Sequence, residues 1–358
     1  MVKLLANLAE LFPAGMAFKR IGHVLAALLV GAVSLVPMRV GAEAFEAEFD
    51  KAFGTELREP ASFQATYPSP LEQRISQLAA SAKGRIGVAA LDLATGEQVS
   101  ILGNQRFPMA STSKIAIAAT FLEGVDQGRW SLDDKFPLMV PLATKPLSTK
   151  VAPVKPGARF TARELIEMMI TRSNNQATDG LLAVVGGPQA VNDWVRRAGI
   201  RDFRIDRDIA TLVRDDGVVD PATSIDLRDS ATPLAMVQLL KGIHEGRWLS
   251  SSSRLVLLGA MERCLTGKNR IRGNMPADVI VAHKTGSLYN TSSDVGIITT
   301  PEGRTIAVAI YVTGGQNDRG YRIDRIATIA RALYDGYTQP RMQWVNATYD
   351  TAPAGGGS

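Results

Sequence analysis

The 358-residue sequence has one cysteine and three histidines. A single thiol, Cys264, excludes an intrachain disulfide and a thiolate metal cluster. His23 falls in a leader that we expect to be removed, which leaves His244 and His283, too few for a histidine-rich zinc site. We therefore expect chemistry that uses neither a metal nor a cofactor.

Long runs of one charge are also missing. The formal net charge is +5 and the pI is about 9.3, but acidic residues are interspersed and no block of five or six basic residues occurs. We therefore expect no nucleic-acid partner. Hydrophobic residues at 46% and charged residues at 21% are typical of a soluble globular protein, and the length suits one domain with additional end segments.

The N-terminal residues have the order of a secretory signal. Lys19 and Arg20 precede an apolar run at 24–36, and small residues follow around 40–44. We predict a signal peptide at 1–44, with Met16 as an alternative start and an uncleaved anchor as the competing interpretation. The run is too short for a permanent span, so we expect a periplasmic or secreted protein with no stable membrane span after signal removal.

Hydrophobic periodicity predicts a sheet completed by distant segments. Residues 45–70 form an extended lead segment, 71–340 the folded domain and 341–358 a flexible tail. The fold class is α/β (α+β): an antiparallel sheet flanked by helices, with an inserted all-helical subdomain at about 111–265. Expected helices cover 71–82, 111–127, 161–172, 176–185, 188–198, 232–245, 251–264 and 319–334, and expected strands lie in 85–102, 279–284, 294–299 and 305–312.

Ser111-Thr112-Ser113-Lys114 opens the first helix of the inserted region. Positions three apart share a helix face, so the Ser111 hydroxyl and the Lys114 amine lie within hydrogen-bond reach. The helix dipole favours the negative charge that develops when the hydroxyl becomes a nucleophile. Lys114 can accept its proton if burial and cationic neighbours lower the lysine pKa. Such a pair alone is more often a solvated helix surface.

A second motif, Ser173-Asn174-Asn175, lies between two expected helices. Ser173 and Asn175 should point into one cleft, where Ser173 could pass a proton to a leaving nitrogen and Asn175 could hold a substrate amide. By itself this motif is most often a helix cap. Its order and placement relative to Ser111 favour a catalytic role.

A third motif, Lys284-Thr285-Gly286, ends an expected strand and is followed by Ser287. Lys284 can attract a substrate carboxylate, Thr285 adds a hydroxyl, and Gly286 lets an acyl chain approach the backbone. The backbone N–H groups of Ser111 and Ser287 would form an oxyanion hole. For the neighbouring His283 a packing role is the favoured interpretation.

These motifs together resemble those of the class A β-lactamases and, more broadly, of the penicillin-binding proteins. The resemblance covers about residues 71–340. It includes the stretch 168–179 around the second motif and the stretch 266–287 leading into the third. It implies a β-lactamase/transpeptidase-like fold, a cleft between the sheet and the helical subdomain, and a β-lactam or D-Ala-D-Ala-like peptide as the small-molecule substrate. We expect a monomer.

The sequence departs from this family in two places. Asn174 stands where the family usually has aspartate. In addition, the loop between Arg204 and Asp229 contains no glutamate, the residue with which the family activates its hydrolytic water. Arg207 could close the loop by pairing with Asp229. Counting from Arg207, either Asp208 or Ile209 falls near the position of the family's glutamate. Asp208 is the first candidate for a substitute deacylation base and Asp206 the second, with a structural role open for both.

Three functions follow from these residues. The first is a β-lactamase that hydrolyses its acyl-enzyme, the second a DD-peptidase or penicillin-binding protein with slow deacylation, and the third a non-enzymatic cell-wall or β-lactam sensor. The single compact domain favours the first, whereas the missing glutamate favours the others. A Ser-His-Asp hydrolase is disfavoured because no Gly-x-Ser-x-Gly elbow surrounds any serine.

Overall fold

The computed structural model describes residues 57–58, 69–80, 84–315 and 318–338. The chain divides into two units, residues 1–55 and 56–358, and all described residues belong to the second. The predicted signal peptide, most of the lead segment and the whole of the predicted tail lie outside the described residues. Within the described part, no helix combines the length and hydropathy that a membrane crossing needs.

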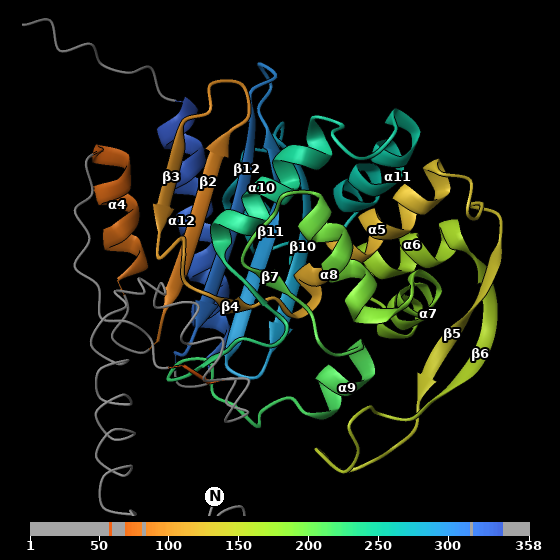
Figure 1. Cartoon of the computed structure of the whole chain (residues 1–358). Helices are drawn as coiled ribbons and strands as arrows, with labels where there is room; N and C mark the ends of the chain where they lie inside the picture. The colour runs from red at the N-terminus through yellow and green to blue at the C-terminus, as the bar shows by residue number, and fades with distance from the viewer. Residues whose placement is uncertain (1–56, 59–68, 81–83, 316–317, 339–358) are drawn as a thin grey trace, which may run out of the picture. The chain divides into compact units, whose positions relative to one another are not determined.

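Five antiparallel strands from the two ends of the domain form the main sheet, as the sequence predicts (Figure 1). Two come from the N-terminal hairpin and three from the C-terminal part of the domain. In spatial order they are β10 (Ile280–Leu288), β11 (Thr291–Thr299), β12 (Thr305–Thr313), β2 (Ile86–Asp92) and β3 (Gln98–Ile101).

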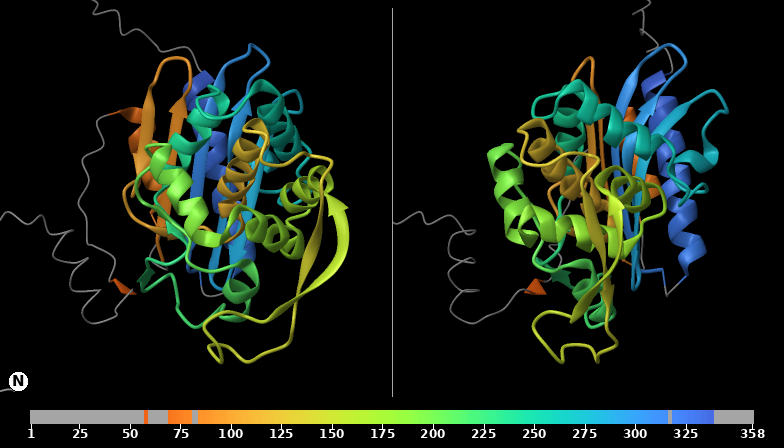
Figure 2. Two further views of the ribbon diagram at one scale, coloured as in Figure 1. Left: turned by 45° about the vertical axis from the view of Figure 1, so that its right-hand side comes forward. Right: turned by 90° about the vertical axis from the view of Figure 1, so that its right-hand side faces the viewer.

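Both faces of this sheet are buried, because alternate residues of each central strand enter different cores. In β12, Ile306, Val308 and Ile310 pack under α4 (Pro70–Ala79) and α12 (Arg319–Thr338). Ala307, Ala309 and Tyr311 belong to the core shared with the helical region. Figure 2 shows α12 on one side of the sheet and the helical region on the other.

Several helices of the inserted region start at polar caps. Thr161 forms the predicted capping box with Glu164, and Asn174, Thr232 and Ser250 each accept a hydrogen bond from the first turn of their helix. Pro233 occupies a first-turn position that tolerates proline. The helices are α5 (Lys114–Asp126), α6 (Ala162–Thr171), α7 (Asn175–Val185), α8 (Gly187–Arg197), α10 (Pro233–His244) and α11 (Ser251–Glu262).

The inserted region is not wholly helical. A long hairpin of β5 (Lys135–Pro141) and β6 (Val154–Thr161) forms its outer edge (Figure 1). Five prolines within 135–156 interrupt the alternation from which a sequence analysis recognises strands. Short elements complete the fold. These are β1 (Leu57–Arg58), β4 (Phe107–Pro108), β7 (Phe203–Arg204), α9 (Ile209–Arg214), β8 (Ile225–Asp226), β9 (Ser230–Ala231), and the 3₁₀ turns η1 (Ala110–Ser113) and η2 (Ile271–Asn274).

Candidate active site

Ser111 lies in the tight turn η1, just before α5 begins at Lys114. Its neighbours are buried and fixed. The Thr112 hydroxyl donates to the Met109 carbonyl at 2.7 Å and lies 3.2 Å from the Tyr311 hydroxyl, and the Ser113 hydroxyl donates to the Ala110 carbonyl at 2.8 Å. Ser111 itself is partly exposed and lines a polar cavity. The turn therefore presents one hydroxyl of three to the solvent side.

The Lys114 ammonium is fully buried and reaches the second motif. Its Nζ donates to Asn175 Oδ1 at 2.7 Å, to the Ser173 carbonyl at 2.8 Å and to Ser173 Oγ at 3.3 Å. Burial, helped by the charge of Lys284, lowers the pKa of Lys114 well below its usual value, against an opposing effect of Asp179. Such a lysine can be neutral and act as a base. The geometry thus joins the first two motifs through the amine of Lys114.

The second motif forms a sharp turn between α6 and α7. Ser173 has φ +57°, a left-handed conformation that costs free energy in a residue with a Cβ and is concentrated at functional sites. Asn174 caps α7 by accepting the Ala177 N–H at 2.8 Å. The amide at this position therefore holds the turn, which leaves Ser173 and Asn175 both lining the Ser111 cavity.

The third motif places Thr285 and Ser287 in the cavity wall, but not Lys284. The Lys284 side chain is fully buried in β10 and its Nζ donates to the Thr285 carbonyl at 3.0 Å. Burial lowers the pKa of Lys284 to about 8. This ammonium lies beneath the cavity surface. It can therefore attract a substrate carboxylate through its charge, whereas its N–H groups are not exposed in the cavity for a direct hydrogen bond.

Gly286 brings β10 against η1. A Cβ at this position would lie 2.6 Å from the Met109 carbonyl oxygen and 2.4 Å from Ser293 Oγ, closer than Cβ atoms approach such atoms. Only glycine therefore allows this strand to lie next to the turn that carries Ser111. The same approach is what an oxyanion hole shared by the two segments requires.

Arg270 is a residue of this site that the sequence did not reveal. It is almost fully buried, lines the Ser111 cavity, and donates to Ser287 Oγ at 2.6 Å and to the Gly286 carbonyl at 2.8 Å. A second arginine, Arg319 of α12, lines the same cavity. No spacing rule indicates either residue, because the tertiary fold decides whether an arginine lines a cavity. Together they make this side of the cavity cationic.

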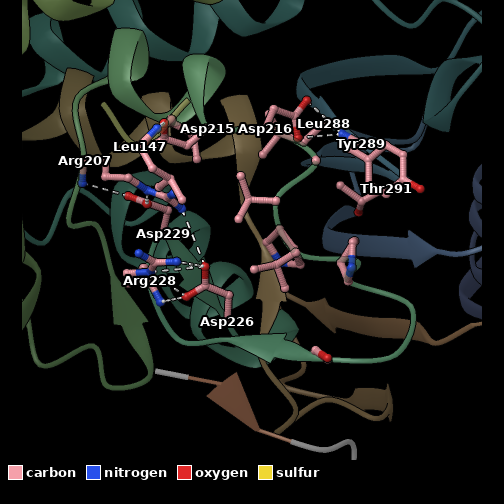
Figure 3. Close-up of a pocket in the computed structure, with 17 residues that line it drawn as sticks. Leu147, Arg207, Asp215, Asp216, Asp226, Arg228, Asp229, Leu288, Tyr289 and Thr291 are labelled. Atoms are coloured by element: carbon pink, nitrogen blue, oxygen red, sulfur yellow. Dashed lines mark hydrogen bonds and ion pairs between the residues drawn. The ribbon is translucent and has the colours of Figure 1, made fainter. Parts of the chain in front are cut away.

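The loop after the second motif closes as the sequence predicts. Arg207 Nε donates to Asp229 Oδ2 at 2.5 Å (Figure 3). Asp229 Oδ1 accepts the N–H groups of Asp206 and Arg207. Further along, Asp216 accepts the Tyr289 N–H from the turn between β10 and β11. The loop is therefore anchored both at its base and onto the main sheet.

Neither sequence-based candidate for the deacylation base lines the Ser111 cavity. Asp206 forms an ion pair with Arg204, with 2.8 Å between Oδ1 and Nε. Asp208 is the N-cap of α9 and accepts the Thr211 N–H at 2.7 Å. Both side chains therefore have structural partners in the loop.

A different carboxyl group interacts electrostatically with Lys114. Asp179 on α7 is almost fully buried and accepts the N–H groups of Ile209 at 2.7 Å and Ala210 at 2.9 Å. Burial raises the pKa of Asp179 to about 7, and the charge of Asp208 adds to this effect. The sequence contains a sign of this residue, because Asp179 follows Asn175 by four positions and so shares its helix face.

His283 has the packing role that the sequence favours. Its ring is fully buried, and Nδ1 lies 2.9 Å from both carboxylate oxygens of Asp294 on β11. Asp294 also accepts the N–H of Ile271 at 3.1 Å. The pair links β10 and β11 to the segment that carries Arg270.

Comparison with known proteins identifies the family. Residues 70–337 match the model of the β-lactamase enzyme family. The chain is 32% identical over 271 residues to the β-lactamase CTX-M-8 of Citrobacter amalonaticus, covering 75% of this chain and 89% of that protein. It is 28% identical over 285 residues to the extended-spectrum β-lactamase PER-1 of Pseudomonas aeruginosa, covering 76% and 89%. The chain therefore belongs to the class A β-lactamase family of serine hydrolases.

Solved structures agree with this assignment. The crystal structure of a β-lactamase from Chitinophaga pinensis superimposes with a TM-score of 0.66 at 31% identity, covering 75% of this chain and all of that one. The TLA-1 extended-spectrum β-lactamase also gives a TM-score of 0.66, at 27% identity, covering 75% and 98%. The predicted fold class is thus confirmed.

Proposed function

We propose that this chain is an exported β-lactamase that opens β-lactam rings through an acyl-Ser111 intermediate. The observation that carries the proposal is the hydrogen-bonded group of Lys114, Ser173 and Asn175 beside a partly exposed Ser111. Family membership supports the substrate class, since the relatives bear the name β-lactamase. Export to the periplasm or medium is supported by the charged, apolar and small-residue order of residues 19–44.

Acylation begins with Ser111 Oγ attacking the carbonyl carbon of the lactam. Lys114, neutral because of its lowered pKa, accepts the hydroxyl proton. The N–H groups of Ser111 and Ser287 stabilise the oxyanion. Ser173, 3.3 Å from the Lys114 amine, hands a proton to the departing ring nitrogen as the C–N bond breaks.

Substrate is held by the groups around this centre. Asn175 offers its side-chain amide to the acylamide of the substrate, and Thr285 offers its hydroxyl. The substrate carboxylate is drawn to the cationic side of the cavity, to which Arg270 and the buried Lys284 contribute. Gly286 keeps the backbone of β10 accessible to the acyl chain.

The loop composition favours a second candidate function. Without a glutamate between Arg204 and Asp229, acylation could proceed while release of the acyl group is slow, as in a penicillin-binding protein with DD-peptidase activity or in a β-lactam sensor. Asp208 remains the sequence-based candidate for the base that avoids this outcome. In all three functions the ligand is a β-lactam or a D-Ala-D-Ala-like peptide.

A labelled penicillin and a chromogenic cephalosporin separate these functions. Steady turnover of the cephalosporin supports the β-lactamase. A stoichiometric burst that stalls supports the other two, and release of D-alanine from a peptidoglycan peptide then separates a peptidase from a sensor. Absence of labelling, or labelling that survives Ser111→Ala, would contradict the proposed nucleophile.

A further inference from the structure

A buried carboxyl group lines a cavity that shares one of its residues, Asn175, with the Ser111 cavity. Asn175 lines the Ser111 cavity and also an adjoining cavity between α7, α9 and the β5–β6 hairpin. Asp179, one helical turn after Asn175, lines that second cavity. Among the described residues that line either cavity, Asp179 is the one carboxylic acid.

We propose that Asp179 is the general base of deacylation, taking a proton from the water that attacks the acyl-Ser111 ester. The inference rests on the proposed function, because it presupposes that ester. In this role Asp179 takes the place of Asp208, which serves as the cap of α9. Asp179 lies on α7, the helix that also carries Asn175.

The step balances without any further reactant. The carboxylate of Asp179 takes one proton of the water, and the water oxygen bonds to the ester carbonyl carbon. The bond from that carbon to Ser111 Oγ then breaks, and its electron pair goes to Oγ. The proton held by Asp179 returns to Oγ with Lys114 as the carrier, so that the products are a free acid and the starting enzyme.

The surroundings of Asp179 suit this task. Its two oxygens accept one backbone N–H each, from Ile209 and Ala210, and a carboxylate has lone pairs left for a water molecule. The charged groups around it are Lys114 on α5, Asp208 at the start of α9, and Arg214, which lines the same cavity. The hairpin contributes the uncharged residues Met139, Pro141 and Leu142.

The pKa of about 7 that burial gives this acid is close to neutral pH. A general base works best when its pKa lies near the pH at which the enzyme operates, because it is then largely ionised and still holds a proton well. Deacylation should therefore fall as the pH is lowered through about 7, whereas formation of the acyl-enzyme need not follow the same curve.

The test measures release of label from the acyl-enzyme. Wild-type protein and Asp179→Asn are loaded with fluorescent penicillin, chased with unlabelled drug, and followed by gel fluorescence. We expect Asp179→Asn to acquire label on Ser111 and to lose it at least about 100-fold more slowly, the usual minimum effect of a general base. Asp193→Asn, the same change at a partly exposed position of α8, is the matched control and should release label at the wild-type rate.

Three results would overturn the inference. They are release from Asp179→Asn at the wild-type rate, wild-type label that never leaves, and loss of release in Asp208→Asn but not in Asp179→Asn. Failure of the wild type to take any label would instead remove the acyl-Ser111 intermediate of the proposed function. That failure is distinguishable from the first and third results, in which the wild type takes label and releases it.

A pH profile guards against a purely structural effect. Wild-type release should fall as the pH drops through about 7, and the residual release in Asp179→Asn should lack this inflection. If circular dichroism shows that Asp179→Asn does not fold, the pH profile of label release is compared between the wild type and Asp179→Glu, which keeps a carboxylate. A profile that is flat between pH 5 and pH 9 would overturn the inference.

Discussion

At the scale of single residues, the site keeps two lysine ammonium groups out of water. The side chains of Lys114 and Lys284 are both fully buried. Burial disfavours the charged form of each lysine and so lowers both pKa values. The two charges also oppose each other, because Lys284 contributes to the lowered pKa of Lys114. In the proposed mechanism Lys284 therefore favours the neutral form of Lys114 that accepts a proton, at the expense of folding stability.

We expect Lys284→Met to stabilise the protein at pH 7. Because the folded pKa of Lys284 is about 8 and its ordinary value 10.5, the unfolded chain binds this proton more tightly. The wild-type free energy of unfolding then rises as the pH increases from about 8 to 10.5. At pH 7 the charged lysine costs on the order of 3 kcal/mol, which the methionine avoids.

Urea unfolding of both proteins at pH 7 and pH 10 checks this expectation. The advantage of Lys284→Met should be largest at pH 7 and shrink toward pH 10, while acylation by penicillin becomes slower. A variant less stable than the wild type at pH 7 would contradict the account of Lys284 as a functional charge that destabilises the fold.

Whether a single side chain is buried is what the sequence does not show. Ser111, Lys114, Ser173 and Asn175 could be recognised because their spacing repeats a chemical pattern. For Asp179 the sequence offers only its spacing from Asn175, and for Arg270 it offers no sign, because the importance of each depends on which distant segments cover it. A formal charge in a sequence does not tell whether water reaches it.

At the scale of elements, the loop after the second motif depends on one buried ion pair. Asp229 is almost fully buried, and burial raises its pKa even with Arg207 beside it. Asp229 also has φ +52°. The base of the loop is thus held in a costly conformation by a contact that the sequence did predict.

We expect Arg207→Ala to lower the free energy of unfolding by about 3 kcal/mol, because it leaves the Asp229 carboxylate buried without its cation. The loss should shrink at lower pH, where Asp229 can take a proton. Arg196→Ala is the control. It removes an exposed arginine that pairs with Asp193, a kind of pair that contributes less than about 1 kcal/mol. Equal urea midpoints for the two variants would contradict the role given to Arg207.

The elements that could be predicted from the sequence have a clear hydrophobic period, and the elements that were missed do not. The long helices and the central strands follow clear periods of 3.6 and 2, and polar caps mark several helix starts. The β5–β6 hairpin is proline-rich and largely exposed, so no alternation marks it. Helix α9 has six residues, too few for a periodic signal.

At the scale of the whole molecule, the site exists only where the sheet meets the helical region. Ser111 and the second motif belong to the helical side, whereas Thr285 and Ser287 belong to β10. The strands of the sheet come from both ends of the domain. We therefore expect catalysis to depend on how closely β10 approaches η1.

We expect Gly286→Ala to slow acylation by about 100-fold, because the new Cβ would force β10 away from Met109, and a displacement of about 1 Å can cost this much in rate. Gly259→Ala on α11 is the matched control, since its Cβ meets only the end of the Arg263 side chain at 3.2 Å. Stopped-flow acylation measures both. Equal rates would show that the close approach of β10 is not needed.

Mass spectrometry of the protein after brief mixing with a penicillin tests directly whether Ser111 is acylated. We expect one added penicillin mass, located by peptide mapping on Ser111, and no addition to Ser111→Ala. An adduct on another residue, or one that persists in Ser111→Ala, would contradict this expectation.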